Sequence, residues 1–532
     1  MFPVVSTFFV LILAYKVWLP RTFEIFEADR AKIFLYVASL MAILVWLICR
    51  FPPLISSSYA PDEAWFVHEV VVRNNDQGSD NFFWWFNRYF AQANLFGYGG
   101  LWWGIYSFVL DLSSMIFPPV MKMSSEVPGP PNFTTNFLSV VESGNEYMQF
   151  AMWVMRSLAL SVAAIFMLRL SRRILKEPLA ALGLVLLLTM PMMYWSGKLA
   201  SPEYFGAFLL LVSAFEYFES RNPNWFLLSG IACGAKLTCA PVAAILLIYG
   251  LIVEWRKGGV KYCFLLGGRF LIGLLLVNLY FIFHPIEFVS NLLKFSSLFP
   301  AAPWRLSFMY GPLPFWEGGT YGNLSYWYGS IFVFFAVIVM SVCANPKLGL
   351  WFLLAALAMF LFMLTQPLHN WYWFPVILAS VIPLSFSTVK GKVYRAILAI
   401  GVGILICINL KYSVGIINSE VGFRASHISE YQSFDAIQPC FDSVLTRVKP
   451  NKVYDMAMIG KIVKVPIESH HISYPESFSS LPNIQDFSAS SDSVALIGPR
   501  ATSVGPIINF IERVLDSGAE HGMCGKTFWV RF

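Results

Sequence analysis

Charged residues are scarce in this sequence. Asp, Glu, Lys and Arg make up 13% of its 532 residues, whereas a soluble domain carries about 25%. The apolar share is 57%, so the composition excludes an ordinary soluble protein and indicates one whose main solvent is lipid. The formal charge is only +6 and the basic residues lie in short loops, so we expect no nucleic-acid partner.

Paired cysteine motifs are also missing. None of the eight cysteines belongs to a CxxC pair or a cysteine–histidine array, which argues against a zinc or redox centre. Six lie in apolar runs and are interpreted as inert packing residues: Cys49, Cys233, Cys239, Cys263, Cys343 and Cys407. A Gly-rich phosphate loop is absent too, which argues against a nucleotide-bound substrate.

Apolar runs long enough, or nearly long enough, to cross a bilayer recur along the chain. They cover residues 2–19, 33–49, 150–168, 179–195, 204–218, 262–283, 326–344, 348–365, 371–388 and 396–412. Residues 225–254 are too long for one span and carry Gly230, Gly234, Lys236 and Pro241 near the middle. We therefore predict a hairpin of two short helices there. The fold class is an all-α polytopic membrane domain of about twelve hydrophobic segments.

Short basic loops set the predicted orientation, because loops rich in lysine and arginine stay in the cytoplasm. Three such loops lie at residues 169–176, 256–261 and 390–395. All three loops lie on the cytoplasmic side only if the hairpin of residues 225–254 returns to the side of the membrane from which it entered. An outer loop of 50–149 with interfacial helices, an outer loop of 284–325 and the tail after residue 412 then face outside.

The tail, residues 413–532, alternates helix-like and strand-like runs at 435–448, 453–459, 494–497, 507–515 and 527–532. It predicts a small extracytoplasmic α/β domain beside a transmembrane catalytic domain of residues 1–412. Cys440 and Cys524 are the two cysteines outside the spans, and an outer domain with two cysteines has one intramolecular pairing, so we predict a disulfide. Two free thiols are the alternative, because spacing does not show that their Cα atoms approach within about 7 Å.

Acidic residues stand at the starts of two outer segments. Asp62 and Glu63 directly follow a membrane span, where a carboxylate can act as a base or a metal ligand. A helix start is their structural alternative, since acidic residues there offset the helix dipole. Glu203 follows a Ser–Pro pair, so helix capping explains it as well. Its place at the same membrane face favours function, because two acidic sites on one surface can share a proton or a cation.

Cationic and hydrogen-bonding residues of the outer regions are candidates for binding a phosphate or a sugar. They are Arg88, Lys198, Lys236, Arg305, His369 and Tyr372. Lys236 stands where the hairpin turns, and an ionisable residue at membrane depth is a functional candidate, with snorkelling as its alternative. Residues 94–103 mix glycines with aromatic residues. This pattern suits stacking on sugar rings or polyprenyl chains, or an amphipathic helix lying on the bilayer.

The order of these elements over residues 33–388 resembles the GT-C class of integral membrane glycosyltransferases, in particular protein O-mannosyltransferases and lipid A aminoarabinose transferases. The resemblance implies that Asp62, with Glu63 beside it, is the first-loop catalytic carboxylate, and that Glu203 is the second-loop acid. Lys236 and Thr238 match the family's hairpin element in reversed order. A His–Tyr element before the Pro-rich span, His369 and Tyr372, falls on the phosphate side.

The resemblance also implies a reaction. An acceptor hydroxyl displaces polyprenyl phosphate from the anomeric carbon of a hexosyl or pentosyl donor with inversion, and Asp62 accepts the hydroxyl proton, directly or through a divalent metal ion held by Asp62 and Glu203. The acceptor is a lipid-linked glycan, a lipid or a protein. Membrane lipids are the other partners, and the expected location is the bacterial inner membrane with the site on its extracytoplasmic face.

Two other function classes stay open at the level of sequence. A transporter or flippase of lipid-linked saccharides predicts charges along a path inside the spans, whereas most charges here lie in loops. The chain also lacks the long-period repeat of transporters built from two related halves. A polymerase or ligase of lipid-linked glycans uses the same materials as a transferase, and the sequence does not separate the two.

Overall fold

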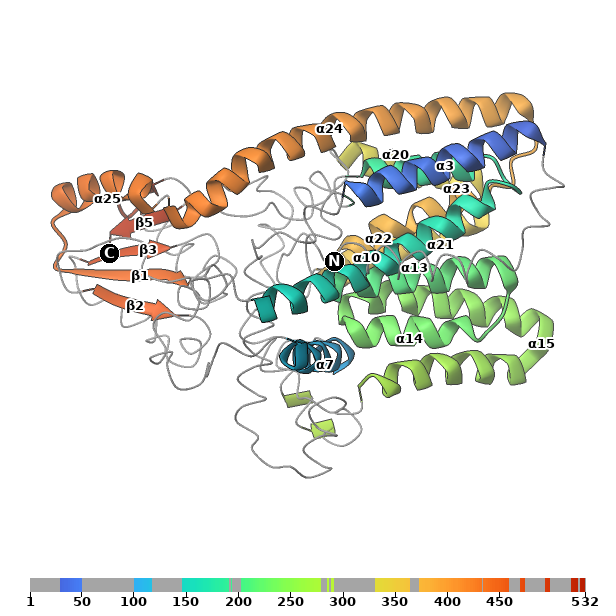
Figure 1. Cartoon of the computed structure of the whole chain (residues 1–532), viewed down its shortest axis with the longest axis horizontal. Coiled ribbons are helices and arrows are strands. Elements are labelled where there is room, and N and C mark those ends of the chain that lie inside the picture. Colours follow the sequence, from blue (N-terminus) through green and yellow to red (C-terminus); the bar gives the residue numbers. More distant parts are fainter. Residues whose placement is uncertain are drawn as a thin grey trace.

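The computed structural model combines a helical bundle with a small β-sheet (Figure 1). It describes residues 29–49, 100–116, 146–190, 193, 202–278, 285–286, 289–290, 331–363, 373–432, 434–458, 469–473, 493–497, 518–524 and 527–531. The first apolar run, residues 2–19, lies outside these ranges. The count of twelve hydrophobic segments therefore stays a prediction.

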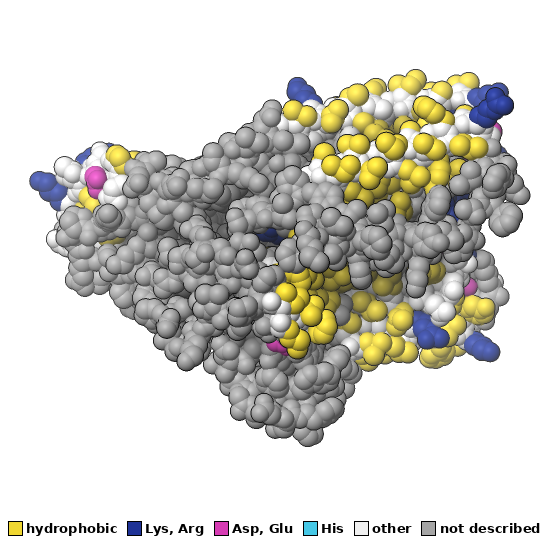
Figure 2. Space-filling view, in the orientation of Figure 1, with side chains coloured by type: hydrophobic (Ala, Val, Ile, Leu, Met, Phe, Trp, Pro, Cys, Tyr) yellow, Lys and Arg dark blue, Asp and Glu magenta, His cyan; other side chains and the backbone are white. Residues whose placement is uncertain are grey.

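The bundle is built from apolar helices. They are α3 (Arg30–Ile48), α7 (Gly100–Ile116), α10 (Glu146–Arg173), α11 (Ala180–Thr189), α13 (Pro202–Ser220), α14 (Trp225–Ala235), α15 (Ala240–Leu276), α20 (Ile331–Ala344), α21 (Pro346–Met363), α22 (Phe374–Ala379), α23 (Val381–Ser385) and α24 (Lys392–Gln432). Within the described ranges, five helical segments are long and apolar enough to cross a membrane. Side chains such as Phe34, Phe264 and Phe332 are exposed on the bundle surface, where Figure 2 shows broad hydrophobic areas. An apolar exterior on apolar helices is what lipid requires, and the chain is an integral membrane protein.

Aromatic side chains fill the bundle interior. Phe166 of α10 contacts Phe208 and Phe215 of α13. Phe218, at the far end of α13, contacts Trp351 of α21 and lies near Phe386, just after α23. Helix α13 is buried along almost its whole length. It is therefore the central helix, and both of its ends meet several neighbours.

The hairpin predicted at residues 225–254 is present, and it breaks at Lys236. Helix α14 ends there because Lys236 has extended backbone angles (φ −153°, ψ 125°), and the short 3-10 helix η2 (Leu237–Cys239) leads into α15. The Tyr217 hydroxyl, near the end of α13, donates to Glu254 at 3.3 Å, and Tyr217 also contacts Phe226 at the start of α14. The first part of α15 thus returns to the level where α14 began, which confirms the break.

A second reversal occurs inside α15 at Gly259, whose positive φ of 64° interrupts the helix. A side chain is rarely compatible with this φ, so glycine suits the turn. The segment after the turn packs closely on α14, since a Cβ at Gly230 would overlap the carbonyl oxygen of Phe270. Glycine at position 230 therefore sets how near the two helices approach.

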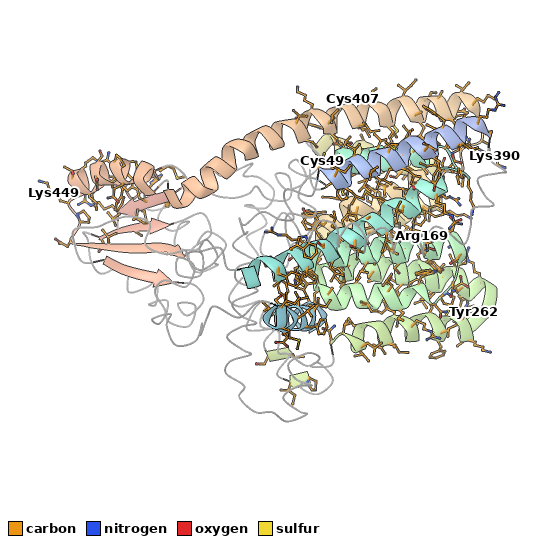
Figure 3. All side chains as sticks on the ribbon, viewed as in Figure 1. Cys49, Arg169, Tyr262, Lys390, Cys407 and Lys449 are labelled. Atoms are coloured by element: carbon orange, nitrogen blue, oxygen red, sulfur yellow. A yellow bond between two sulfur atoms is a disulfide. The ribbon has the colours of Figure 1, made fainter. Side chains whose placement is uncertain are left out.

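The three predicted inner loops lie at one end of the bundle. Arg173 donates from Nε to the Ser385 carbonyl oxygen at 3.2 Å, and Arg395 Nη2 lies 3.2 Å from Glu177 Oε2. Figure 3 labels Arg169, Tyr262 and Lys390 at this end, and Cys49 toward the other end of α3. We call these the basic end and the opposite end.

The C-terminal region begins where α24 runs out of the bundle (Figure 1). Helix α25 (Phe434–Val448) is followed by strands β1 (Lys452–Met458), β2 (Ser469–Ser473), β3 (Ser493–Ile497), β4 (His521–Cys524) and β5 (Thr527–Arg531). The strand order is β2-β1-β3-β5-β4. Strand β1 pairs in parallel with β2 and β3, whereas β5 is antiparallel to β3 and β4. Phe441, Leu496 and Trp529 belong to a core separate from that of the bundle.

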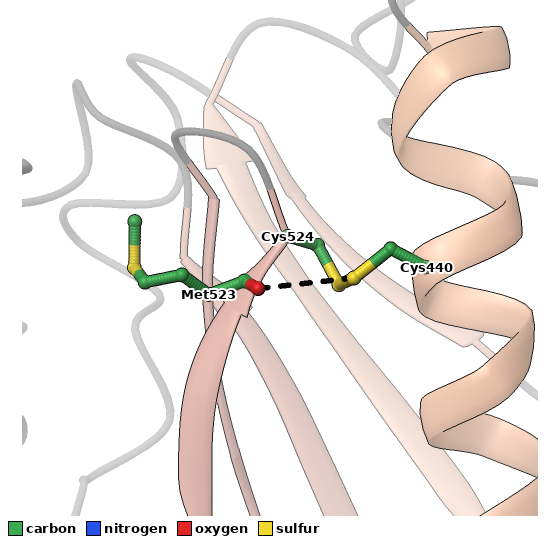
Figure 4. Close-up of a disulfide and its surroundings, with 3 residues drawn as sticks. All are labelled: Cys440, Met523 and Cys524. Carbon is green, nitrogen blue, oxygen red and sulfur yellow. Dashed lines mark hydrogen bonds between the residues drawn. A yellow bond between two sulfur atoms is a disulfide. The ribbon is translucent and has the colours of Figure 1, made fainter.

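The two tail cysteines form a disulfide (Figure 4). Cys440 of α25 and Cys524 of β4 have Cα atoms 5.7 Å apart and are separated by 84 residues in sequence. Cys440 Sγ also lies 3.7 Å from the carbonyl oxygen of Met523. The bond ties the first helix after α24 to the last hairpin of the sheet.

Candidate functional site

Two of the candidate residues lie at the opposite end of the bundle, on neighbouring elements. Glu203 is in the first turn of α13, which starts with Pro202. Proline fits a first helical turn because no intrahelical acceptor is lost there. Lys236 is the residue that ends α14. Both side chains are buried, at 5% and 3% exposure.

The structure joins these two side chains in an ion pair. Lys236 Nζ lies 2.7 Å from Glu203 Oε1. From the sequence, Glu203 was expected to be an acid and Lys236 a phosphate ligand, and their contact was not predicted. A charge is costly at low dielectric unless an opposite charge compensates it, so each residue makes the burial of the other tolerable.

Close packing fixes the geometry of this pair. A Cβ at Gly206, one turn after Glu203, would lie 3.1 Å from both the Ala232 carbonyl oxygen and Cys239 Sγ. The hairpin tip therefore rests directly on the first turn of α13, and a larger residue at position 206 would have to push it away. Lys236 is held over Glu203 by backbone packing as well as by charge.

Aromatic residues from two other elements flank the first turn of α13. Trp102 of α7 lies 5.2 Å from Phe205, measured between ring centroids, and Phe374 of α22 lies 4.3 Å from Tyr204. Trp102 belongs to the Gly/aromatic stretch of residues 94–103, and it is fully buried. Its burial against Phe205 of α13 favours a packing role over stacking on an exposed sugar.

Two buried polar groups were not among the predicted site residues, although the resemblance had included Thr238 in the hairpin element. Thr238 Oγ1, in η2, has no hydrogen-bond partner within the described structure. Arg156 of α10 is 1% exposed and was also missed. The sequence does point to Arg156, because it is the single charged residue in the apolar run of 150–168. Charged residues within a membrane span mark functional regions.

A metal site is not formed by the residues that the structure describes. No group of three or more His, Cys, Asp or Glu side chains gathers among them. Glu203 Oε1 already faces the Lys236 ammonium group, so a divalent ion at this oxygen would have to displace a cation that is in place. The described donor set does not fit a metal, and no reaction step is assigned to one.

The remaining candidate residues lie outside the described ranges. They are Asp62, Glu63, Arg88, Lys198, Arg305, His369 and Tyr372. Their roles stay predictions. Three of the segments that carry them follow or precede described elements at the opposite end: residues 50–99 follow α3, 194–201 precede α13 and 364–372 follow α21.

Comparison with known proteins gives a distant likeness. No protein-family model and no curated protein matches the sequence. The structure is similar to the crystal structure of ArnT from Cupriavidus metallidurans in the apo state, with 12% identity, a TM-score of 0.45, and coverage of 92% of this chain and 97% of that chain. It is also similar to the ArnT structure from the same organism bound to undecaprenyl phosphate, with 13% identity and a TM-score of 0.43. That match covers 94% of this chain and 98% of the ArnT chain. A likeness with TM-scores below 0.5 assigns neither an activity nor a residue's role to this chain.

Proposed function

We propose that this protein is a membrane glycosyltransferase that takes a hexosyl or pentosyl group from a polyprenyl-phosphate carrier. The acceptor is a hydroxyl of a lipid-linked glycan, a lipid or a protein at the extracytoplasmic face of the bacterial inner membrane. The observation that carries the proposal is the buried Glu203–Lys236 pair at 2.7 Å. It lies at the end of the bundle away from the basic loops.

The position of the pair suits a lipid-linked donor. A polyprenyl phosphate keeps its chain among lipid tails and its phosphate at the membrane surface, so its reacting carbon is presented at the depth of a helix end. The phosphate becomes the leaving group, and its developing negative charge needs a fixed positive group nearby. Lys236 supplies an ammonium group with three N–H donors, and Glu203 orients it.

The proposed reaction is a single displacement. The acceptor oxygen forms a bond to the anomeric carbon while the bond from that carbon to the phosphate oxygen breaks, and polyprenyl phosphate leaves with the bonding electrons. Asp62 takes the acceptor's proton. Lys236 stabilises the departing phosphate, and Glu203 is a positioning residue that acts through Lys236.

A transfer assay tests the proposal. Purified protein in lipid nanodiscs is incubated with a panel of radiolabelled polyprenyl-phosphate sugars and membrane lipids, and label leaving the carrier is measured. We expect Glu203→Gln to lower kcat/KM by about 10- to 100-fold, because a charge-assisted hydrogen bond is lost. Glu216→Gln, the same change near the other end of α13, is the control and should keep full transfer.

Two outcomes would reject the proposal. One is that label never leaves any carrier in the panel. The other is that label crosses the membrane while still attached to its carrier, which is the behaviour of a flippase. In either case the Glu203–Lys236 pair would need a different explanation.

Asp62→Asn tests the base. We expect transfer to fall by at least about 100-fold, because the variant cannot accept the acceptor's proton. Expression and thermal stability should not change. Full activity in this variant would remove Asp62 from the mechanism and leave the donor side of the proposal standing.

A further inference from the structure

Thr238 carries a buried hydroxyl that the bundle does not satisfy. The residue is 4% exposed, and its Oγ1 has no hydrogen-bond partner in the described part of the chain. An orphaned hydroxyl inside a protein is unfavourable, and more so where water is scarce. A site that tolerates it suggests that a partner arrives later.

The usual local solution is missing at this position. Serine and threonine hydroxyls in helices donate to a carbonyl oxygen three or four residues earlier, and several in this bundle do so: Ser113, Ser161, Thr189, Ser220, Ser380 and Ser385. Thr238 is in the three-residue 3-10 helix η2, directly after the extended backbone of Lys236. The break that ends α14 therefore leaves the hydroxyl without that carbonyl partner.

The orphaned hydroxyl is close in the chain to the buried charges. Thr238 is two residues from Lys236, whose ammonium group contacts Glu203. The same short turn is pressed onto α13, because a Cβ at Gly206 would lie 3.1 Å from Cys239 Sγ. Thr238 thus belongs to a rigid turn that also carries the only described lysine of this hairpin tip.

We propose that the Thr238 hydroxyl donates a hydrogen bond to a phosphate oxygen of the lipid-linked donor. The inference rests on the proposed function and gives a specific role to Thr238, which the resemblance placed in the hairpin element without assigning it a ligand. Lys236 is partly neutralised by Glu203, so a neutral donor two residues later in the same turn adds recognition without adding net charge. The hydroxyl gains its partner only in the complex, and its hydrogen bond therefore contributes fully to binding.

Binding of undecaprenyl phosphate in nanodiscs tests this role. Thr238→Val keeps the shape of the side chain and removes the hydroxyl, and we expect it to raise the Kd by about 10- to 100-fold. Thr238→Ser keeps a hydroxyl and should stay within about threefold of the parent protein. The melting temperature of Thr238→Val should equal or exceed that of the parent, because the variant removes an orphaned polar group, so weaker binding would not reflect unfolding.

The outcomes separate this inference from the proposed function. If the parent protein binds undecaprenyl phosphate and Thr238→Val binds it equally well, the role of Thr238 is overturned and the transferase proposal is untouched. If the parent protein does not bind it and transfers no label, the proposed function falls, and the inference with it. Weak binding by both Thr238→Val and Thr238→Ser would point to packing of the turn and would also overturn the hydroxyl's role.

Discussion

The two ends of α13 carry the same residue types in different surroundings. Near its C-terminus, Glu216 lies 3.0 Å from Arg169 and Glu219 lies 2.7 Å from both Arg173 and Lys176. The Lys176 side chain is 46% exposed. At the N-terminus, the Glu203–Lys236 pair is 5% and 3% exposed.

The difference lies in how much each ion pair depends on its partner. Glu219 faces two cations, and solvent reaches this end, so the loss of one partner is compensated by the other and by water. Lys236 and Glu203 have little access to solvent, and losing either leaves a buried charge. Basic residues also gather at the Glu219 end, which the sequence predicts to be cytoplasmic. Under the proposed function, charge at the Glu219 end orients the chain in the membrane, whereas charge at the other end takes part in the reaction.

The largest expected effect concerns sidedness. In a chain whose native Cys49, Cys343 and Cys407 are replaced by alanine, Lys449→Cys should be labelled by an impermeant maleimide in intact cells, and Lys390→Cys should not be labelled until the membrane is opened. Both positions are exposed and are labelled in Figure 3. The reverse pattern would place the basic end outside and remove the extracytoplasmic site.

The second effect concerns stability at the buried pair. Glu203→Gln removes the carboxylate that faces the buried Lys236 ammonium group, and we expect it to lower the free energy of unfolding by about 3–5 kcal/mol. The double variant Glu203→Gln/Lys236→Met removes both charges and should recover most of that loss while sugar transfer stays low. Thermal denaturation in detergent and the transfer assay measure the two properties separately. Recovery of transfer in the double variant would mean that the pair is structural only.

The third effect is confined to the C-terminal sheet. Replacing Cys440 and Cys524 by serine should destabilise this region by about 2–4 kcal/mol, since the bond constrains a long loop in the unfolded chain. The bundle should melt as before, because its core shares no residues with the core of the sheet. Limited proteolysis of the tail measures the change. Free alkylation of both cysteines in the parent protein without a reductant would contradict the bond and the oxidising compartment.

The smallest effect is expected at the basic end. Lys176→Ala removes one of two cations around Glu219, and the change in unfolding free energy should be below about 1 kcal/mol. Thermal denaturation of Lys176→Ala and Glu203→Gln under the same conditions compares the two ends directly. A loss of unfolding free energy as large as that in Glu203→Gln would show that the ion pairs at the two ends contribute equally to stability.

Sequence reasoning was strongest where a pattern is local. The break at Lys236 followed from glycines, a lysine and a proline inside one apolar run, and the shared end of the basic loops followed from the positive-inside rule. The disulfide needed only that two cysteines remained after the spans were assigned. The helix α25 and strands β1, β3 and β5 coincide with the helix-like and strand-like runs of the tail.

Contacts between distant residues were beyond the sequence. Glu203 and Lys236 meet because α14 folds back on α13, and the closeness of that approach depends on Gly206. The orphaned hydroxyl of Thr238 depends on the exact turn that follows α14. Arg156 was overlooked for another reason, since a single charge in a long apolar run does not change the assignment of the span.

Helix α24 sets the position of the sheet by simple geometry. Its 41 residues correspond to a rod of about 60 Å, roughly twice the hydrocarbon thickness of a bilayer. The part beyond Val414, here called the spacer, extends past the segment that could cross a membrane and leads out of the bundle toward the sheet (Figure 1). The number of residues in this spacer also sets the rotation of the sheet about the helix axis, because one inserted residue would rotate everything beyond it by about 100°. The length of α24 therefore sets how far the sheet lies from the bundle, and its helical phase sets which way the sheet faces.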